Sequence, residues 1–136
     1  MPQEEDGMSQ TNLTIYLVED DDSVRKALKR LVRSFGYGVD AFASAFDVLD
    51  IIPSHKPDCL IVDVQMPGMN GLDLQQHLNE AGYKLPIIYI TAHEDAHVHQ
   101  RAMRAGAVAF LQKPFSDDIL LEAIHVATGQ SGNTTI

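Results

Sequence analysis

Cys59-Leu60-Ile61-Val62-Asp63 contains the main evidence for the fold of this chain: four apolar residues followed at once by a carboxylate. A short, continuous apolar run is typical of a strand that is buried on both faces of a parallel sheet. Three further runs have the same form, and each leads to polar side chains: residues 15–18 before Glu19-Asp20, residues 87–90 before Thr91, and residues 107–111 before Lys113-Pro114. The sequence therefore predicts four buried strands, each with polar side chains at or just after its carboxyl end.

Helical patterns alternate with these runs. A fifth run, residues 37–42, alternates apolar and polar positions and predicts an edge strand. The first helix has an apolar stripe, begins at Asp22 or Ser23 and ends at Gly36; the stripe is Val24, Ala27, Leu28, Leu31, Val32 and Phe35. The other predicted helices are residues 45–52 before Pro53, a helix capped by Asn70 and ended by Gly82, residues 94–105 before Gly106, and a helix capped by Ser116 with the core face Ile119, Leu120, Ala123, Ile124 and Ala127. Five strands alternating with five helices predict an α/β (βα)5 chain with a doubly wound parallel sheet.

The polar residues all come at or just after the ends of predicted strands. In a parallel sheet these ends meet at one edge, so we expect the carboxylates of Glu19, Asp20 and Asp63 to share a pocket with the Thr91 hydroxyl and the Lys113 ammonium. Neighbouring carboxylates repel by roughly 1 kcal/mol per pair in water and about 4 kcal/mol at an effective dielectric of 20. The pattern therefore predicts a site for a hard divalent cation and a magnesium-assisted phosphoryl acceptor.

Composition limits the class of protein. The 136 residues predict one domain at residues 13–128, with flexible tails at residues 1–12 and 129–136. A net charge of −9 disfavours direct contact with nucleic acid or anionic membranes. The single cysteine, Cys59, lies within an apolar run and is expected to be a buried thiol. No secretory signal and no run near the roughly 20 apolar residues of a membrane span is visible, which predicts a cytoplasmic protein.

Four stretches together resemble the receiver domain of the response regulators of two-component systems, over about residues 14–127. They are Tyr16-Leu17-Val18-Glu19-Asp20 with Arg25 beyond; Asp58-Cys59-Leu60-Ile61-Val62-Asp63-Val64-Gln65-Met66-Pro67-Gly68-Met69-Asn70-Gly71; Ile90-Thr91-Ala92; and Ala105-Gly106-Ala107-Val108-Ala109-Phe110-Leu111-Gln112-Lys113-Pro114-Phe115. The last stretch looks most like the nitrogen-fixation-regulator (FixJ-like) branch. The resemblance implies the flavodoxin-like fold with strand order 2-1-3-4-5.

The resemblance also implies roles for the polar residues. Asp63 would be the phosphoacceptor, forming an aspartyl phosphate. Mg²⁺, or Mn²⁺ in its place, would be held by the carboxylates of Glu19, Asp20 and Asp63 and by the backbone carbonyl of Gln65. A shift of alignment by one residue would transfer the first two roles to Asp20 and Asp21.

Other residues would complete the switch. Lys113 would pair with Asp63 before phosphorylation and with the phosphoryl oxygens afterwards, and the family typically carries the Lys113–Pro114 bond in cis. Thr91 would donate its hydroxyl to the phosphoryl group, and Phe110 would be the aromatic switch residue; the alternative for Phe110 is a core ring that never moves. Gln65 and His93 match the two positions that tune the lifetime of the phosphoryl group.

The resemblance implies a phosphoprotein that acts in signal transduction or in a phosphorelay. It would take its phosphoryl group from a sensor histidine kinase or a histidine phosphotransfer protein and change an output surface that controls a partner, a dimer or an effector domain. By resemblance, that surface is formed by the fourth helix, fifth strand and fifth helix, where a homodimer would also form. The chain would not be an enzyme beyond its own magnesium-dependent phosphorylation and dephosphorylation. The alternative is a receiver-like interaction domain that works without phosphorylation.

One motif competes with this interpretation. His93-Glu94-Asp95-Ala96-His97 satisfies the H-E-x-x-H pattern of zinc peptidases. That chemistry needs two histidines one turn apart on a helix and a third ligand. Here the motif follows a strand end, where a helix is only starting, so we expect solvated histidines rather than a zinc site.

Overall fold

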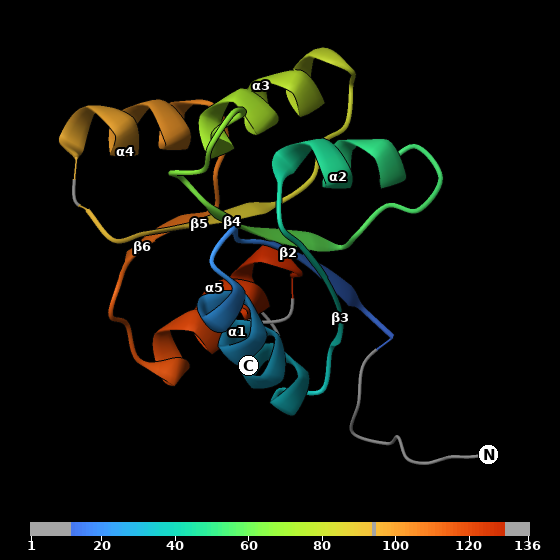
Figure 1. Cartoon of the computed structure of the whole chain (residues 1–136), viewed down its shortest axis with the longest axis vertical. Coiled ribbons are helices and arrows are strands. Elements are labelled where there is room, and N and C mark those ends of the chain that lie inside the picture. The colour runs from blue at the N-terminus through green and yellow to red at the C-terminus, as the bar shows by residue number, and fades with distance from the viewer. Residues whose placement is uncertain (1–11, 94, 130–136) are drawn as a thin grey trace.

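A single parallel sheet forms the centre of the computed structural model, which describes residues 12–93 and 95–129 (Figure 1). The strands are β2 (Thr14–Val18), β3 (Gly38–Phe42), β4 (Cys59–Asp63), β5 (Ile87–Thr91) and β6 (Ala109–Gln112). They lie in the order β3-β2-β4-β5-β6, and every neighbouring pair is parallel. Numbered along the chain this is 2-1-3-4-5, so the predicted flavodoxin-like order is confirmed.

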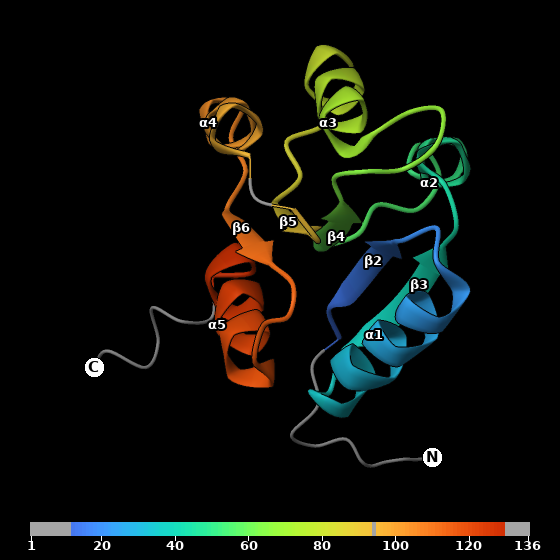
Figure 2. The same ribbon diagram turned by 60° about the vertical axis from the view of Figure 1, so that its left-hand side comes forward.

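Helices cover both faces of the sheet. They are α1 (Asp22–Ser34), α2 (Ala45–Ile51), α3 (Gly71–Glu80), α4 (Ala96–Arg104) and α5 (Asp117–Ala127). Helices α2, α3 and α4 lie on one face, while α1 and α5 lie on the other (Figures 1 and 2). Because successive side chains of a strand point to opposite faces, Tyr16 and Leu60 enter the core under α2–α4, whereas Ile15 and Ile61 enter the core under α1 and α5.

Side-chain caps fix where the helices begin. Asn70 caps α3 and Ser116 caps α5, as expected, and Asp73 completes a capping box with Asn70. Helix α1 is capped by Asp21, one residue before the predicted start, since its carboxylate accepts a hydrogen bond from the Val24 amide at 3.0 Å. Asp95 caps α4, which therefore begins at Ala96 rather than near residue 94.

The fourth apolar run was predicted to be a strand buried on both faces, and that is wrong. Strand β6 starts at Ala109, two residues later than predicted, and its side chains are half-buried or exposed. It is the last strand of the sheet, so it has a neighbour on one side only. The amide of Ala107 is used to close α4, donating to the Ala102 carbonyl at 3.0 Å.

Two members of the predicted helix stripes also face solvent. Ala27 of α1 is exposed, and Ile119 of α5 is 51% exposed, because each lies at the border of its apolar stripe. Cys59 is fully buried in the central strand, and burial raises the pKa of its thiol to about 12, which makes it an unreactive core residue. Within the described ranges no helix has the length and apolar character needed to cross a membrane. The predicted tails lie almost entirely outside the described residues.

Candidate functional site

Strand register brings the polar residues of the sequence motifs to one edge of the sheet. Val18 pairs with Val62, so Glu19 and Asp63, which follow them, come side by side on the two central strands. Thr91 ends β5 opposite Gln112 of β6, and the Lys113 amide donates to the Thr91 carbonyl at 2.7 Å. The carboxyl ends of four strands therefore supply the expected groups.

Three carboxylates form a tight cluster there. Glu19, Asp20 and Asp63 each offer an oxygen, and these oxygens lie within 4.8 Å of one another. Glu19 and Asp63 are buried, at 1% and 7% exposure, while Asp20 is exposed. The carboxylate of Asp21 caps α1 instead, so it is Glu19 and Asp20 that face Asp63.

The ammonium of Lys113 compensates part of this charge. Its Nζ lies 3.0 Å from Glu19 Oε1 and 3.6 Å from Asp63 Oδ2. The lysine therefore bridges two carboxylates and is closer to Glu19, whereas sequence reasoning expected Asp63 to be its partner. The Lys113–Pro114 bond is cis, as the family resemblance implied.

The remaining oxygen of Asp63 is held by backbone. The Gln65 amide donates to Asp63 Oδ1 at 3.0 Å, while the Gln65 side chain is exposed. Thr91 is buried, and its hydroxyl donates to the His93 carbonyl at 2.9 Å, so it is engaged within its own loop. His93 is exposed.

Phe110 is half-buried on β6. Its ring stacks on His99 of α4, with centroids 4.6 Å apart and planes 7° apart, and lies 6.0 Å from the buried ring of Tyr89. The ring thus touches both the sheet and α4.

The charges of this edge fit a hard cation. One ammonium lies beside a cluster of three carboxylates, and an all-oxygen set of ligands suits Mg²⁺. Burial raises the pKa of Glu19 above its usual range, while the hydrogen bond from the Asp21 amide and the ion pair with Lys113 oppose that rise. Burial has the largest effect on this pKa, so keeping Glu19 ionised lowers the stability of the folded protein.

Glu19→Gln should therefore raise the melting temperature at neutral pH. Since the folded protein binds the Glu19 proton more tightly than the unfolded chain, the stability linked to this group is present below the usual pKa of 4.5 and is lost as pH rises through the raised value. We expect a gain of a few degrees at pH 7 that disappears near pH 4, measured by calorimetry. Glu122→Gln, at an exposed position, is the control. A lower melting temperature at pH 7 would show that the ion pair with Lys113 outweighs burial.

The zinc-peptidase motif does not form a helical ligand pair. Helix α4 begins at Ala96, so His93 precedes the helix and is not one turn before His97 on it. Residue 94 lies outside the described residues. Across residues 12–93 and 95–129, the acidic cluster is the one group of three or more metal-ligating side chains.

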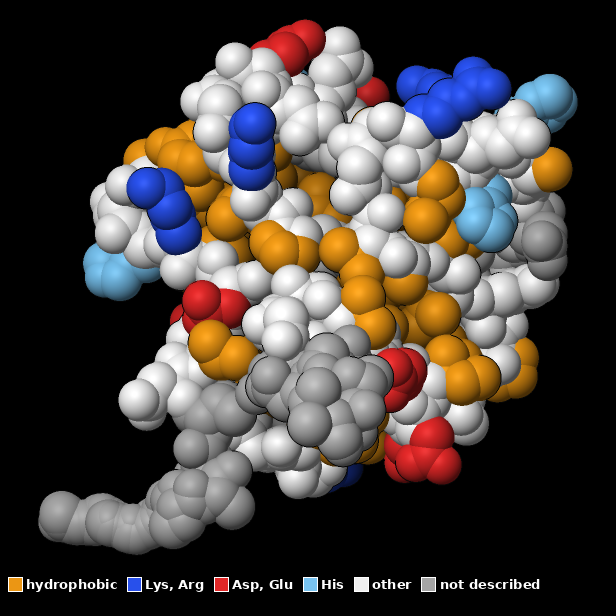
Figure 3. Space-filling model, turned by 180° about the vertical axis from the view of Figure 1, so that it is seen from behind, with side chains coloured by type: hydrophobic (Ala, Val, Ile, Leu, Met, Phe, Trp, Pro, Cys, Tyr) orange, Lys and Arg blue, Asp and Glu red, His pale blue; other side chains and the backbone are white. Residues whose placement is uncertain are grey.

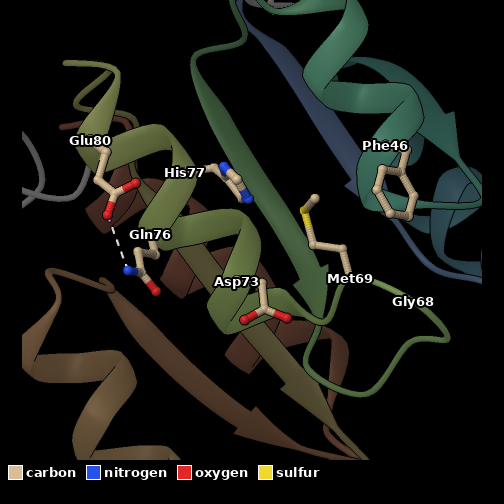
Figure 4. Close-up of a pocket in the computed structure, with 7 residues that line it drawn as sticks. All are labelled: Phe46, Gly68, Met69, Asp73, Gln76, His77 and Glu80. Atoms are coloured by element: carbon tan, nitrogen blue, oxygen red, sulfur yellow. Dashed lines mark hydrogen bonds between the residues drawn. The ribbon is translucent and has the colours of Figure 1, made fainter.

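Two cavities of the surface have no carboxylate of the acidic cluster in their linings. One of about 340 Å³ lies between α2 and α3 and is lined by Phe46, Gly68, Met69, Asp73, Gln76, His77 and Glu80 (Figure 4). Another, of about 540 Å³, opens where β5 and β6 begin, with Leu85, Pro86 and Val108 in its lining. From behind, hydrophobic side chains form a band among scattered charges (Figure 3). The acidic edge is thus a small polar site, separate from these hollows.

A doubly wound parallel sheet with this acidic edge defines a receiver-type α/β domain. The chain belongs to the response regulator receiver domain family, whose model matches residues 15–125. The family is that of two-component response regulators, as the sequence motifs predicted.

Similar proteins of known sequence or structure are consistent with this family. The response regulator protein TodT of Pseudomonas putida is 45% identical over 120 residues, covering 88% of this chain and 53% of TodT. Nodulation protein W of Bradyrhizobium diazoefficiens is 45% identical, covering 87% and 52%. The crystal structure of FixJ-N superposes with a TM-score of 0.82 at 35% identity, covering 88% of this chain and 96% of that one. The chain spans about half the length of the curated relatives it matches.

Sequence reasoning missed one buried polar residue, Gln75. It is 2% exposed and bonded within the core. Its spacing was the available signal, since Gly71, Leu74, Gln75 and Leu78 fall on one face of α3.

Proposed function

We propose that this receiver accepts a phosphoryl group on Asp63 from a sensor histidine kinase or a histidine phosphotransfer protein, with Mg²⁺ as cofactor. One observation carries the proposal: the Asp63 carboxylate lies with Glu19 and Asp20 within 4.8 Å, and Lys113 Nζ bridges the buried pair. A fold needs neither three clustered carboxylates nor a half-buried ammonium, whereas phosphoryl transfer needs both kinds of charge.

The ion would be held by the carboxylates of Glu19, Asp20 and Asp63 together with the Gln65 carbonyl. When bound, Mg²⁺ supplies neutralisation of the negative charge on the phosphoryl oxygens and so lets an anionic carboxylate approach an anionic donor. Asp63 would then attack phosphorus. Its new O–P bond forms as the N–P bond of the donor's phosphohistidine breaks, and the donor imidazole leaves with the bonding electron pair.

Residues around Asp63 would orient its carboxylate, pair with the phosphoryl oxygens and tune the lifetime of the phosphoryl group. The Gln65 amide holds Oδ1 and so orients the carboxylate. Lys113, already 3.6 Å from Oδ2, would transfer its ion pair to the phosphoryl oxygens. Gln65 and His93, with exposed side chains beside the site, would tune how long the phosphoryl group persists.

Thr91 and Phe110 would carry the signal outwards. To reach a phosphoryl oxygen, the Thr91 hydroxyl must give up its bond to the His93 carbonyl, which alters the loop before α4. Phe110 packs on His99 of α4, so a change in its position would alter the surface of α4, β6 and α5. Met103, Ile119 and Val126 are large apolar residues exposed on these helices, which supports a role in partner or homodimer contacts.

Magnesium should stabilise the native protein by relieving repulsion within the cluster. At an ion concentration about ten times the dissociation constant, the gain is about 1.4 kcal/mol. For a domain of this size we expect a rise in melting temperature of about 5 °C, followed by scanning calorimetry over a magnesium titration. Asp20→Asn should reduce the rise, whereas Asp47→Asn, outside the cluster, should not. An unchanged melting temperature at saturating ion would count against the metal site.

The test of the proposed function is intact-mass analysis of the native chain after incubation with acetyl phosphate, with and without Mg²⁺. We expect a magnesium-dependent gain of one phosphoryl group. If no gain occurs with acetyl phosphate or with a panel of phosphorylated histidine kinases and phosphotransfer proteins, the interaction domain that works without phosphorylation is the better description.

A further inference from the structure

Gln75 is a buried polar residue that the proposed chemistry does not use. Among the described residues, four polar or charged side chains are buried: Glu19, Asp63, Thr91 and Gln75. The first three belong to the acidic edge. An amide loses free energy when it leaves water unless its hydrogen bonds are replaced, so the partners of Gln75 indicate what it does.

These partners connect two helices through β5. Gln75 Nε2 donates to the Ala102 carbonyl of α4 at 3.3 Å, and Gln75 Oε1 lies 2.7 Å from the Tyr89 hydroxyl. That hydroxyl is also 2.8 Å from the Gly71 carbonyl. Tyr89 is completely buried, and burial raises its pKa, so the phenol remains a neutral hydrogen-bond donor. Helices α3 and α4 lie next to each other over this part of the sheet (Figures 1 and 2).

Gly71 is where the loop that leaves Asp63 ends. Its amide donates to the Val64 carbonyl at 3.0 Å and so closes residues 64–70, the segment that includes Gln65. A Cβ at Gly71 would lie 2.8 Å from the Tyr89 ring and 3.1 Å from the Asp63 carbonyl oxygen. The Tyr89 side chain therefore holds the acceptor loop (residues 64–70) through both ring contact and a hydrogen bond at its end.

The single proton of the Tyr89 hydroxyl gives this network two possible arrangements. The Tyr89 hydroxyl has one proton but lies close to two acceptor oxygens, those of Gly71 and Gln75. In one arrangement Tyr89 donates to the Gly71 carbonyl and holds the end of the loop. In the other it donates to Gln75 Oε1, which polarises the Gln75 amide and strengthens the bond from Nε2 to the Ala102 carbonyl. A half-turn of the amide is excluded, because it would set Oε1 against the Ala102 carbonyl oxygen.

We propose that Tyr89 and Gln75 are positioning residues that couple the acceptor loop to α4, because the bond that holds α4 competes with the bond that holds the end of the loop. The two arrangements have the same number of hydrogen bonds, so small movements of either segment shift their balance. This deepens, and rests on, the proposed phosphorylation of Asp63: a change in the loop would reach α4 without the Thr91 hydroxyl, and by reciprocity a partner on α4 would alter the loop.

The test measures the backbone carbonyl carbon shifts of Gly71 and Ala102 by NMR, since a carbonyl carbon moves downfield as its oxygen accepts a stronger hydrogen bond. In Gln75→Leu the Tyr89 proton has Gly71 as its acceptor, so the Gly71 carbon should move downfield and the Gly71 amide exchange should slow by up to about fivefold, equivalent to one net hydrogen bond. In Tyr89→Phe no hydroxyl donates to Gln75 Oε1, so the Nε2 bond weakens and the Ala102 carbon should move upfield. A purely structural role would instead loosen the end of the loop in Gln75→Leu as well, and the Gly71 carbon would then move upfield in both variants.

Matched controls are Gln76→Leu, the exposed neighbour that bonds to Glu80 (Figure 4), and Tyr83→Phe. If Tyr89→Phe leaves Ala102 unchanged, or Gln75→Leu leaves Gly71 unchanged or exchanging faster, the coupling is absent. Acetyl phosphate with Mg²⁺ then gives a second readout: the Ala102 carbon should shift on phosphorylation in the native protein and not in Tyr89→Phe. If the chemical shift of the Ala102 carbonyl carbon in the native protein does not change on phosphorylation, the link to Asp63 is overturned. If the native chain takes up no phosphoryl group, the proposed function fails, while the result for the unphosphorylated variants still decides the coupling.

Discussion

Asp63→Asn is expected to abolish the magnesium-dependent gain of one phosphoryl group completely. The amide that replaces the carboxylate is a poor nucleophile, and the cluster loses the oxygen that both Lys113 and the ion would share. The fold should survive, because the Gln65 amide can still donate to the remaining carbonyl oxygen at this position. Removing one of three clustered charges should even add about 1 kcal/mol of stability.

The measurement is intact mass after acetyl phosphate treatment, with a melting curve on the same sample. Asp50→Asn, an exposed position on α2, controls for loss of an aspartate in general. If the Asp63→Asn protein still gains one phosphoryl group with Mg²⁺, the acceptor is another side chain and the proposed assignment is wrong.

Gly71→Ala should cause the largest loss of stability of any methyl addition considered for this chain. The new Cβ would lie 2.8 Å from the Tyr89 ring, 3.1 Å from the Asp63 carbonyl oxygen and 3.1 Å from Val62 Cγ1. All three neighbours belong to buried strands, so none of them can move aside cheaply. Overpacking of this kind costs about 3 kcal/mol, which is a fall in melting temperature of about 12 °C.

Gly38→Ala is the matched control, since a Cβ there would have its nearest neighbours, the Leu13 carbonyl and the Thr14 hydroxyl, at 3.7 Å. Its free energy of unfolding should stay within about 0.5 kcal/mol of the native value. Equal effects of the two substitutions would show that the contact between Gly71 and Tyr89 is not tight. Phosphorylation of Gly71→Ala should also be slower, because the displaced helix start carries the acceptor loop with it.

Most elements of the fold follow from local features. Four-residue apolar runs such as residues 59–62, followed by Asp63, helix caps such as Asn70 and Ser116, and stop signals such as Gly36 each act within a few residues. Alternation of strands and helices then limits the topology to a parallel sheet with crossovers of one hand. The edge where Glu19 and Asp63 meet is a consequence of that topology, which is why the sequence predicts the candidate site.

The details of the site depend on distant segments and could not be predicted in the same way. Local patterns placed Lys113 at the edge, but only packing decided that its ammonium lies nearer to Glu19 than to Asp63. The same holds for β6, whose apolar sequence predicted full burial although its place at the end of the sheet leaves one side open.

Local sequence patterns specify the order of the elements, the sheet and the residues that its strands bring to one edge, because periodicity, caps and turns are local properties. The packing of distant segments sets which of those groups bond to each other, and it forms the buried pair Gln75 and Tyr89. These residues lie 14 positions apart and are joined to α4 at a separation of 27 positions. A hydrogen bond over such a separation depends on how three elements pack, and no local pattern records that distance.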